Sequence, residues 1–423
     1  MKKGNLLKNP EARLWVLMMD KKMPFKLLVP YQEALKLILK HIKPIERKEK
    51  VNIERLTGRV LAEDVQADVF VPPFNRAAMD GYAVRAEDTY GATSTKPKTL
   101  KLVEISSAGK PAKRMVGKGE CIQVATGSPI PTGADAVVML EFTEKVDEEV
   151  HVFKPVYPGA NISLMGEDIK KGENILRNGD LLTPAKVGVL AALGRKEAYV
   201  YEKPRVAVVP TGTEIKEPGS LLEEGQIYDV NSYTLISVLN QNGSEPVRFP
   251  PVPDVFEELD KLVRSLVDYD MIVFSGGSSV GERDLLAQVI KESGEILFHG
   301  VQIKPGKPTL FGLIDGKPVF GMPGYPTSCL SNAYLLLVPA VRKMARLPPK
   351  PKRTVKARIS QRVVLGSGRE QFLTVKIQNG KAVPVFKESG AITSMAEADG
   401  YIVLPANLDV LEVGEEVEVI LLE

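Results

Sequence analysis

A turn rich in glycine and serine constrains this chain more than any other stretch. Residues 275–284, Ser-Gly-Gly-Ser-Ser-Val-Gly-Glu-Arg-Asp, follow the apolar run 271–274 and precede the amphipathic run 285–293. A strand, a tight glycine turn and a helix in this order aim backbone N–H groups and a helix N-terminus at an anion, usually a phosphate. Further along, Lys304 and Lys307 flank a proline- and glycine-containing turn. Two such turns in one segment indicate a nucleotide or oxyanion pocket.

The segment 205–344 alternates strands with helices. Apolar runs at 206–209 and 271–274 predict buried strands, and Asp315-Gly316 predicts a hairpin over 310–321. The alternation is typical of a doubly wound, mostly parallel sheet.

Three helices carry starting signals. Thr183 is an N-cap residue with Pro184 at the first helical position. We expect Asn231 or Ser232 to cap a second helix and Asp254 to cap a third.

Four loops should leave the sheet at its carboxyl edge, where ligands bind in open α/β sheets. They are residues 210–214, 275–284, 304–308 and 323–326. They present a carboxylate at Glu214, hydroxyl and N–H groups, and the two lysines. Each loop alone is an ordinary turn, but the four together indicate a binding site.

Two further regions are predicted to be all-β. Short β-rich runs separated by glycine and proline fill 68–158, and a similar pattern fills 355–422. In the first region, Asp80 opens an Asp-Gly turn that is typical of a hairpin. Two more features stand out in the sequence. Residues 125–135 hold more turn residues than a simple connection needs, and an acidic pair ends at Asp168.

Length, cysteine content and net charge limit the class of protein. The chain has 423 residues, two cysteines and a net charge of +3, which favours about three domains and a reducing cytosol. No apolar run approaches membrane-spanning length, and residues 1–23 form an N-terminal extension. Ten lysines and arginines from Arg342 to Arg369, with no acid between them, form either a face for a polyanion or a solvated linker.

Two other chemistries compete for the same residues. Residues 277–281 match the G-x-S-x-G nucleophile elbow of hydrolases, with Ser279 as nucleophile, but His299 is the only histidine downstream and lies on the next predicted strand. The scarcity of histidine and cysteine argues against a zinc site. A metal here would be a hard ion bound by carboxylates.

The motifs together resemble the MoeA family of molybdopterin molybdenumtransferases, which includes the C-terminal domain of gephyrin. The resemblance covers residues 24–423 and rests on PPFNRAAMDGYAV, ATGSPIPTGADAVV, PGANISLMGEDI, PTGTEI, GQIYDVNSY, SGGSSVGERD, IKPGKP and MPGYPTS. It departs from the family at Ala77, where serine is usual, at Thr213, where aspartate is usual, and at Tyr325, which replaces the asparagine of PGNP.

The resemblance implies a multidomain α/β plus β fold. Its parts are a discontinuous mixed domain I at 24–67 and 163–198, a β-rich domain II at 68–162, a MogA-like doubly wound domain III at 199–345, and a β-barrel-like domain IV at 346–423.

The resemblance also implies roles for individual residues. The catalytic set would be Asp80, Thr126, Asp168, Glu214, Asp254 and Asp284, and the last three would also be metal ligands. The substrate-binding set would be Ser275, Gly276, Gly277, Ser278, Ser279, Pro323 and Pro326. The oxyanion-binding set would be Lys304, Lys307, Ser328, Arg369 and Ser389.

The implied reaction is dependent on Mg²⁺ and turns adenylylated molybdopterin and molybdate, or tungstate, into molybdenum cofactor and AMP. The implied protein is a cytoplasmic homodimer, served by a MogA-type or MoaB-type adenylyltransferase, with no nucleic acid or membrane partner. The rival classes are a binding or scaffold protein of the gephyrin kind, the adenylylating enzyme itself, and the serine hydrolase.

Overall fold

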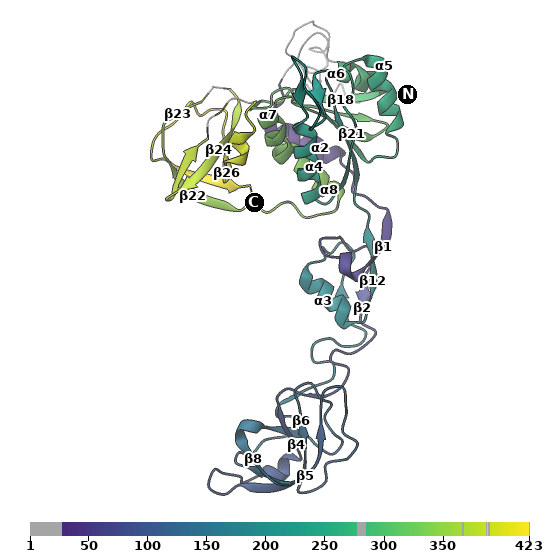
Figure 1. Cartoon of the computed structure of the whole chain (residues 1–423), viewed down its shortest axis with the longest axis vertical. Coiled ribbons are helices and arrows are strands. Elements are labelled where there is room, and N and C mark those ends of the chain that lie inside the picture. Colours follow the sequence, from purple (N-terminus) through teal and green to yellow (C-terminus); the bar gives the residue numbers. More distant parts are fainter. Residues whose placement is uncertain (1–27, 277–284, 366–367, 386, 388–389, 423) are drawn as a thin grey trace, which may run out of the picture. The chain divides into compact units, whose positions relative to one another are not determined.

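The computed structural model describes residues 28–276, 285–365, 368–385, 387 and 390–422. Contacts divide the described chain into two compact units, one of residues 50–200 and one that combines 28–49 with 201–422. Figure 1 shows their helices and strands coloured along the sequence. None of the helices in the described ranges is long and apolar enough to cross a membrane.

A six-stranded sheet forms the centre of the larger unit, in the order β16-β13-β17-β21-β20-β18. The first four strands are parallel and the last two are antiparallel, which confirms the mostly parallel sheet. The expected hairpin is present, with Ile314 opposite Lys317 across the Asp-Gly turn. The strands are β13 (Arg205–Pro210), β16 (Glu245–Arg248), β17 (Met271–Ser275), β18 (Gly294–His299), β20 (Leu310–Ile314) and β21 (Lys317–Met322).

Helices cover both faces of this sheet, as a doubly wound fold requires. One face packs in a core with α2, α4, α7 and α8, and the other packs with α5 and α6. Successive strand residues supply the two cores alternately, since Val206 and Val208 lie in the first and Ala207 and Val209 in the second. The helices are α2 (Tyr31–His41), α4 (Asn231–Gln241), α5 (Phe256–Ser265), α6 (Leu285–Ser293), α7 (Pro326–Asn332) and α8 (Val338–Met344), with a π-helix at Ala333–Leu337.

The residues after 353 form a closed five-stranded barrel. Its strands pair in the order β24-β25-β22-β28-β26, and β26 also pairs with β24. The short β19 (Ile303–Lys304) leaves the α/β domain and pairs in parallel with β24. The barrel strands are β22 (Thr354–Ile359), β24 (Glu370–Gln378), β25 (Lys381–Pro384), β26 (Gly400–Leu404) and β28 (Glu416–Leu421), joined by β23 (Val363–Val364), β27 (Val410–Leu411) and α9 (Thr393–Ala396).

The first three residues of the basic run donate hydrogen bonds within the larger unit. The side chains of Arg342, Lys343 and Arg346 donate to the backbone carbonyls of Pro348, Leu39 and Ile45. Arg342 thus holds the linker against α8, and Lys343 and Arg346 hold the segment that begins with α2.

The smaller unit contains a β-rich region, as expected, with sheet order β7-β4-β6-β5-β9-β8. The expectation of a hairpin at Asp80 is wrong. Residues Arg76–Ala77 (β3) pair with Ile162–Ser163 (β10), whereas β4 pairs with β6 and β7. The sheet strands are β4 (Gly81–Val84), β5 (Lys98–Ser106), β6 (Glu120–Val124), β7 (Ala136–Met139), β8 (Thr143–Val146) and β9 (Glu149–Val152), with 3-10 turns at Ala86–Thr89 and Leu140–Phe142.

The rest of this unit is a mixed region with its own apolar core, which includes Leu61, Leu182 and Leu190. The helix α3 (Pro184–Ala192) begins as predicted, because the Thr183 hydroxyl accepts a hydrogen bond from the Lys186 N–H. The short strands are β1 (Lys48–Asn52), β2 (Val65–Gln66), β11 (Asn174–Leu176) and β12 (Glu197–Tyr201), with a 3-10 turn at Ile53–Arg55.

Replacing Phe311 by alanine should lower the free energy of unfolding by about 3–5 kcal/mol. Phe311 is fully buried between Phe298 and Phe320, with ring centroids 5.8 and 4.8 Å away, so truncation leaves a cavity in the core on one face of the sheet. Urea denaturation measures the change. The exposed Val364→Ala variant is the control and should change it by less than about 0.5 kcal/mol. Equal stability of the two variants would contradict this packing.

Candidate functional site

Three loops at the carboxyl edge of the sheet approach one another through backbone atoms. The Gly276 N–H donates to the Met322 carbonyl at 3.2 Å, and the Thr211 N–H donates to the Ser275 carbonyl at 3.0 Å. A Cβ built on Gly276 would lie 2.7 Å from the Thr211 carbonyl oxygen, and its φ is +92°. Only glycine fits there, for both steric and conformational reasons. The predicted residues Ser275 and Gly276 therefore lie at the edge as expected.

Glu214 and Asp254 follow neighbouring loops at the same edge. A parallel bridge joins Thr211 to Val252, and the Gly212 N–H donates to the Val252 carbonyl at 3.1 Å. Both carboxylates come two or three residues beyond this bridge and are exposed. The expectation that Asp254 caps α5 is wrong, because the helix begins after Val255 and has no side-chain cap.

These two acids fit a magnesium ion by their chemistry. Mg²⁺ prefers hard oxygen ligands and usually binds one or two carboxylates together with substrate phosphates. Among the described residues, no group of three histidine, cysteine or acidic side chains could hold a metal alone. The third predicted ligand, Asp284, lies outside the described residues.

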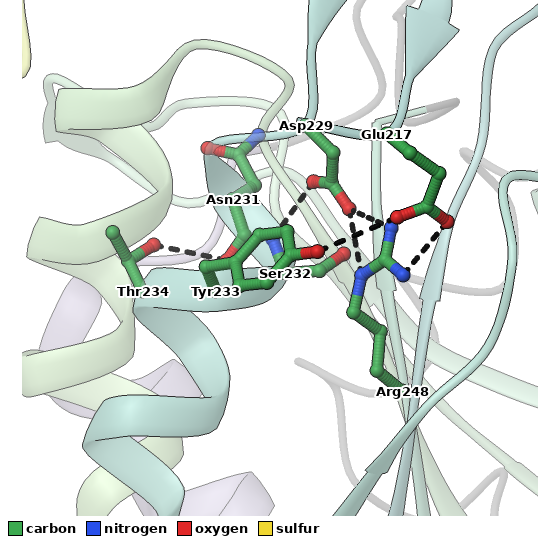
Figure 2. Close-up of polar contacts among 7 residues, drawn as sticks. All are labelled: Glu217, Asp229, Asn231, Ser232, Tyr233, Thr234 and Arg248. Carbon is green, nitrogen blue, oxygen red and sulfur yellow. Dashed lines mark hydrogen bonds and ion pairs between the residues drawn. The ribbon is translucent and has the colours of Figure 1, made fainter. Parts of the chain in front are cut away.

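A buried ion pair holds the start of α4 (Figure 2). The Asp229 carboxylate accepts bonds from the Arg248 guanidinium at 2.9 and 3.1 Å, and the two side chains are 2% and 17% exposed. The other oxygen of Asp229 accepts the Ser232 N–H at 3.0 Å. Asp229 therefore caps α4, and the expectation of a cap at Asn231 or Ser232 is wrong.

The same guanidinium reaches a second acid and an aromatic ring. Arg248 donates to Glu217 at 2.8 Å and lies 4.8 Å from the centroid of the Tyr233 ring. The Glu217 side chain is 44% exposed, so water screens this second pair. Arg248 therefore joins β16 to α4 mainly through Asp229.

Asn231 connects α4 to the loop after β21. Its amide nitrogen donates to the Gly324 carbonyl at 2.8 Å, while its buried amide oxygen accepts no hydrogen bond from the described residues. This loop holds the predicted residues Pro323 and Pro326, and Pro326 is the first residue of α7. Asn231 thus holds the backbone of a predicted substrate-binding loop.

Cationic side chains gather where the barrel meets the α/β domain. Lys304 lies opposite Gln371 in the β19–β24 pairing, and Gln371 comes two residues after Arg369. Burial, and then the charge of Arg369, lower the pKa of Lys307. Two like charges are thus held close together, which favours a bound anion.

Residues of α7 lie beside this cluster. The Asn332 amide donates to the Gly306 carbonyl at 2.8 Å, and Thr327 donates to the Ala391 carbonyl at 3.2 Å. Ser328, on the first turn of α7, is buried. Helix α7 therefore contacts both the lysine loop and the barrel segment after 389, although Ser389 lies outside the described residues.

In the smaller unit, the structure brings Asp80 and Thr126 together. One oxygen of the Asp80 carboxylate accepts the Thr126 N–H at 2.6 Å and its hydroxyl at 2.8 Å. These bonds lower the pKa of Asp80. Asp168 is exposed on the neighbouring loop, where its N–H donates to the Val71 carbonyl at 3.0 Å.

Comparison with known proteins identifies the chain. Residues 29–194 match the MoeA N-terminal region (domain I and II), 207–343 a probable molybdopterin binding domain, and 356–422 the MoeA C-terminal region (domain IV). The molybdopterin molybdenumtransferase of Staphylococcus aureus (strain COL) is 31% identical over 402 residues, which cover 93% of this chain and 96% of the relative. The chain belongs to the MoeA family.

Solved structures agree with this membership. The crystal structure of a molybdopterin biosynthesis MoeA protein from Pyrococcus horikosii is 43% identical in sequence to this chain. The match covers 94% of this chain and 100% of the solved chain, with a TM-score of 0.80. A second structure, of the MoeA protein from Pyrococcus horikoshii OT3, is 37% identical. That match covers 93% of this chain and 100% of the solved chain, with a TM-score of 0.79.

The hydrolase alternative does not fit the MoeA-family fold. His299 is the last residue of β18, which is an outermost strand of the sheet. Strands β20 and β21 lie between β18 and β17, the strand that leads to the glycine turn. Gly277, Ser278 and Ser279 lie outside the described residues. Asp229 and Arg248 were not among the predicted site residues, although Asp229 lies in the GQIYDVNSY motif.

Replacing Arg248 by methionine should lower the free energy of unfolding by about 3–5 kcal/mol, because it leaves the buried Asp229 carboxylate without its partner. The matched Glu217→Gln variant removes only the exposed pair and should cost at most about 1 kcal/mol. Urea denaturation at neutral pH compares them. A loss for Glu217→Gln as large as that for Arg248→Met would contradict the different weights given to the two pairs.

The Thr126→Val variant should raise the pKa of Asp80 part of the way to its ordinary value, because the hydroxyl bond is lost and the N–H bond is kept. A lowered folded-state pKa means that ionised Asp80 stabilises the fold above its unfolded-state pKa, and that this stabilisation is lost as pH falls. Carboxyl-carbon NMR titration measures the pKa. Thr126→Ser keeps the hydroxyl and should leave the pKa low; an unchanged pKa in Thr126→Val would contradict the assignment.

Proposed function

We propose that this MoeA-family chain is a molybdopterin molybdenumtransferase, an enzyme of molybdenum cofactor biosynthesis. It would convert adenylylated molybdopterin and molybdate, or tungstate, into molybdenum cofactor and AMP. The observation that carries the proposal is the pairing of two kinds of site around α7. A glycine-lined carboxyl edge suits a nucleotide, and the lysine and arginine cluster beside it suits a dianion.

The cluster gives the oxyanion a reason to bind. Lys304, Lys307 and Arg369 are the cations that would offset the dianion, with Ser328 and Ser389 as hydroxyl donors. Charge-assisted hydrogen bonds contribute about 1.5–3 kcal/mol each. Molybdate and tungstate are tetrahedral dianions of similar size, so the same residues suit both.

The carboxylates would act on the nucleotide half. Glu214 and Asp254, with Asp284, would hold Mg²⁺ against the phosphates. Bound Mg²⁺ would neutralise phosphate charge and favour cleavage of the bond that releases AMP. The residues Ser275 to Ser279, Pro323 and Pro326 would hold the substrate by N–H groups, hydroxyls and shape. Asp80, Thr126 and Asp168 remain proposed catalytic residues in the smaller unit.

The family resemblance extends the proposal to the setting of the enzyme. It would work as a cytoplasmic homodimer and receive its substrate from a MogA-type or MoaB-type adenylyltransferase. The proposal includes no nucleic acid partner and no membrane partner.

The test follows AMP release from adenylylated molybdopterin by the purified full chain. Release should require Mg²⁺ and either molybdate or tungstate, and the Lys307→Gln variant should raise the KM for the oxyanion at least tenfold, since it loses one charge-assisted bond of about 1.5–3 kcal/mol.

The Lys381→Gln variant is the control, because Lys381 is exposed on the barrel strand β25. Its KM should match that of the parent chain. Tight binding of the substrate without AMP release would favour a binding protein, and release that ignores the oxyanion would overturn the transferase.

A further inference from the structure

The ring of Tyr325 is exposed at the proposed substrate edge. It is 67% exposed and lies in the loop between β21 and α7. Single exposed aromatic residues are common on protein surfaces, so exposure alone indicates nothing. The position of this ring and the rigidity of its loop carry the inference.

The loop is held on both sides of Tyr325. Asn231 donates to the carbonyl of the preceding residue, Gly324, at 2.8 Å. The Tyr325 carbonyl accepts the Cys329 N–H at 2.8 Å, and Pro326 begins α7 directly after it. Bonds before and after the residue fix its backbone, so the exposed ring is presented by a rigid segment.

The surroundings of the ring leave it accessible. A Cβ built on Gly324 would lie 3.8 Å from the Gly276 Cα, so the residue before Tyr325 lies beside the glycine edge of β17. A Cβ built on Gly390, in the barrel, would lie 3.8 Å from Tyr325 Cδ1. A glycine thus occupies the barrel position next to the ring, where a side chain would otherwise pack near it.

We propose that the face of Tyr325 stacks on a fused, nitrogen-containing ring of the substrate. The inference rests on the proposed function and names a specificity-determining residue for it. Adenylylated molybdopterin carries two fused ring systems, the pterin and the adenine, each with a planar nitrogen-containing ring, and an aromatic side chain stacks on such a face with little need for hydrogen bonds. The position of Tyr325 between the glycine edge and the barrel suits either ring.

The test measures the Kd of adenylylated molybdopterin for the full chain by calorimetry, without oxyanion. Tyr325→Ala should weaken binding at least tenfold, about 1.4 kcal/mol, while Tyr325→Phe should stay within twofold because it keeps the ring. The matched control is Tyr157→Ala, which removes another ring that is 73% exposed and should bind like the parent chain. A second titration with AMP alone identifies the ring, since AMP binding falls in Tyr325→Ala only where adenine is stacked.

Two results would overturn the inference: Tyr325→Ala binding within twofold of the parent, or Tyr325→Phe binding as weakly as Tyr325→Ala, which would assign the effect to the hydroxyl. A parent chain that binds the substrate but releases no AMP with molybdate would refute the proposed reaction, and the stacking would still be decided by these Kd values. A parent chain that does not bind would overturn both.

Discussion

The carboxyl edge of the sheet depends on the buried pair between Asp229 and Arg248. Arg248 ends β16, the outermost parallel strand, and Asp229 caps α4 through the Ser232 N–H. The cap sets the first turn of α4, and Asn231 on that turn donates to the Gly324 carbonyl. Arg248, on the outermost parallel strand, is thereby linked through Asp229 and Asn231 to the loop that leads into α7. The local geometry of the proposed substrate loop follows from satisfying one buried carboxylate.

The cation cluster shows a different principle, since the fold holds Lys307 near the like charge of Arg369. Burial and the neighbouring Arg369 lower the pKa of Lys307, so the folded chain disfavours the charged lysine relative to the unfolded chain. The sign means that this contribution destabilises the fold at pH values where an ordinary lysine is charged. Binding of the proposed oxyanion between the two cations would oppose this effect and would therefore stabilise the folded chain.

Local signals in the sequence predicted several elements closely. The amphipathic run 285–293 is α6, and Thr183 and Asp315-Gly316 mark a cap and a hairpin as their chemistry requires. Prediction failed where the partner is distant in sequence. The Asp80 turn is flanked by Arg76–Ala77, which pairs with Ile162–Ser163 instead of β4, and no local pattern reveals that partner.

In the candidate site, too, local signals predicted some residues, and residues with distant partners were missed. Residue types and loop positions were enough to predict that Gly276 and Glu214 lie at the sheet edge, because strand ends fix those positions. The role of Asp229 as the cap of α4 depends on Arg248 from another strand, so the nearer polar residues Asn231 and Ser232 were the better local candidates. The proposed roles of Asp80 and Thr126 came from the family resemblance, and the hydrogen bonds between the two residues were not predicted.

The pairing of β19 with β24 has a consequence for how the chain matures. Lys304 belongs to the α/β domain by sequence, but its strand is hydrogen-bonded to a barrel strand that begins at Glu370. Domains generally fold as they emerge during synthesis, from the N-terminus onward. The sheet and its glycine edge can therefore form before the lysine strand has its partner. The cation cluster is assembled last, so a nascent or C-terminally truncated chain would carry the proposed nucleotide half of the site without the proposed oxyanion half.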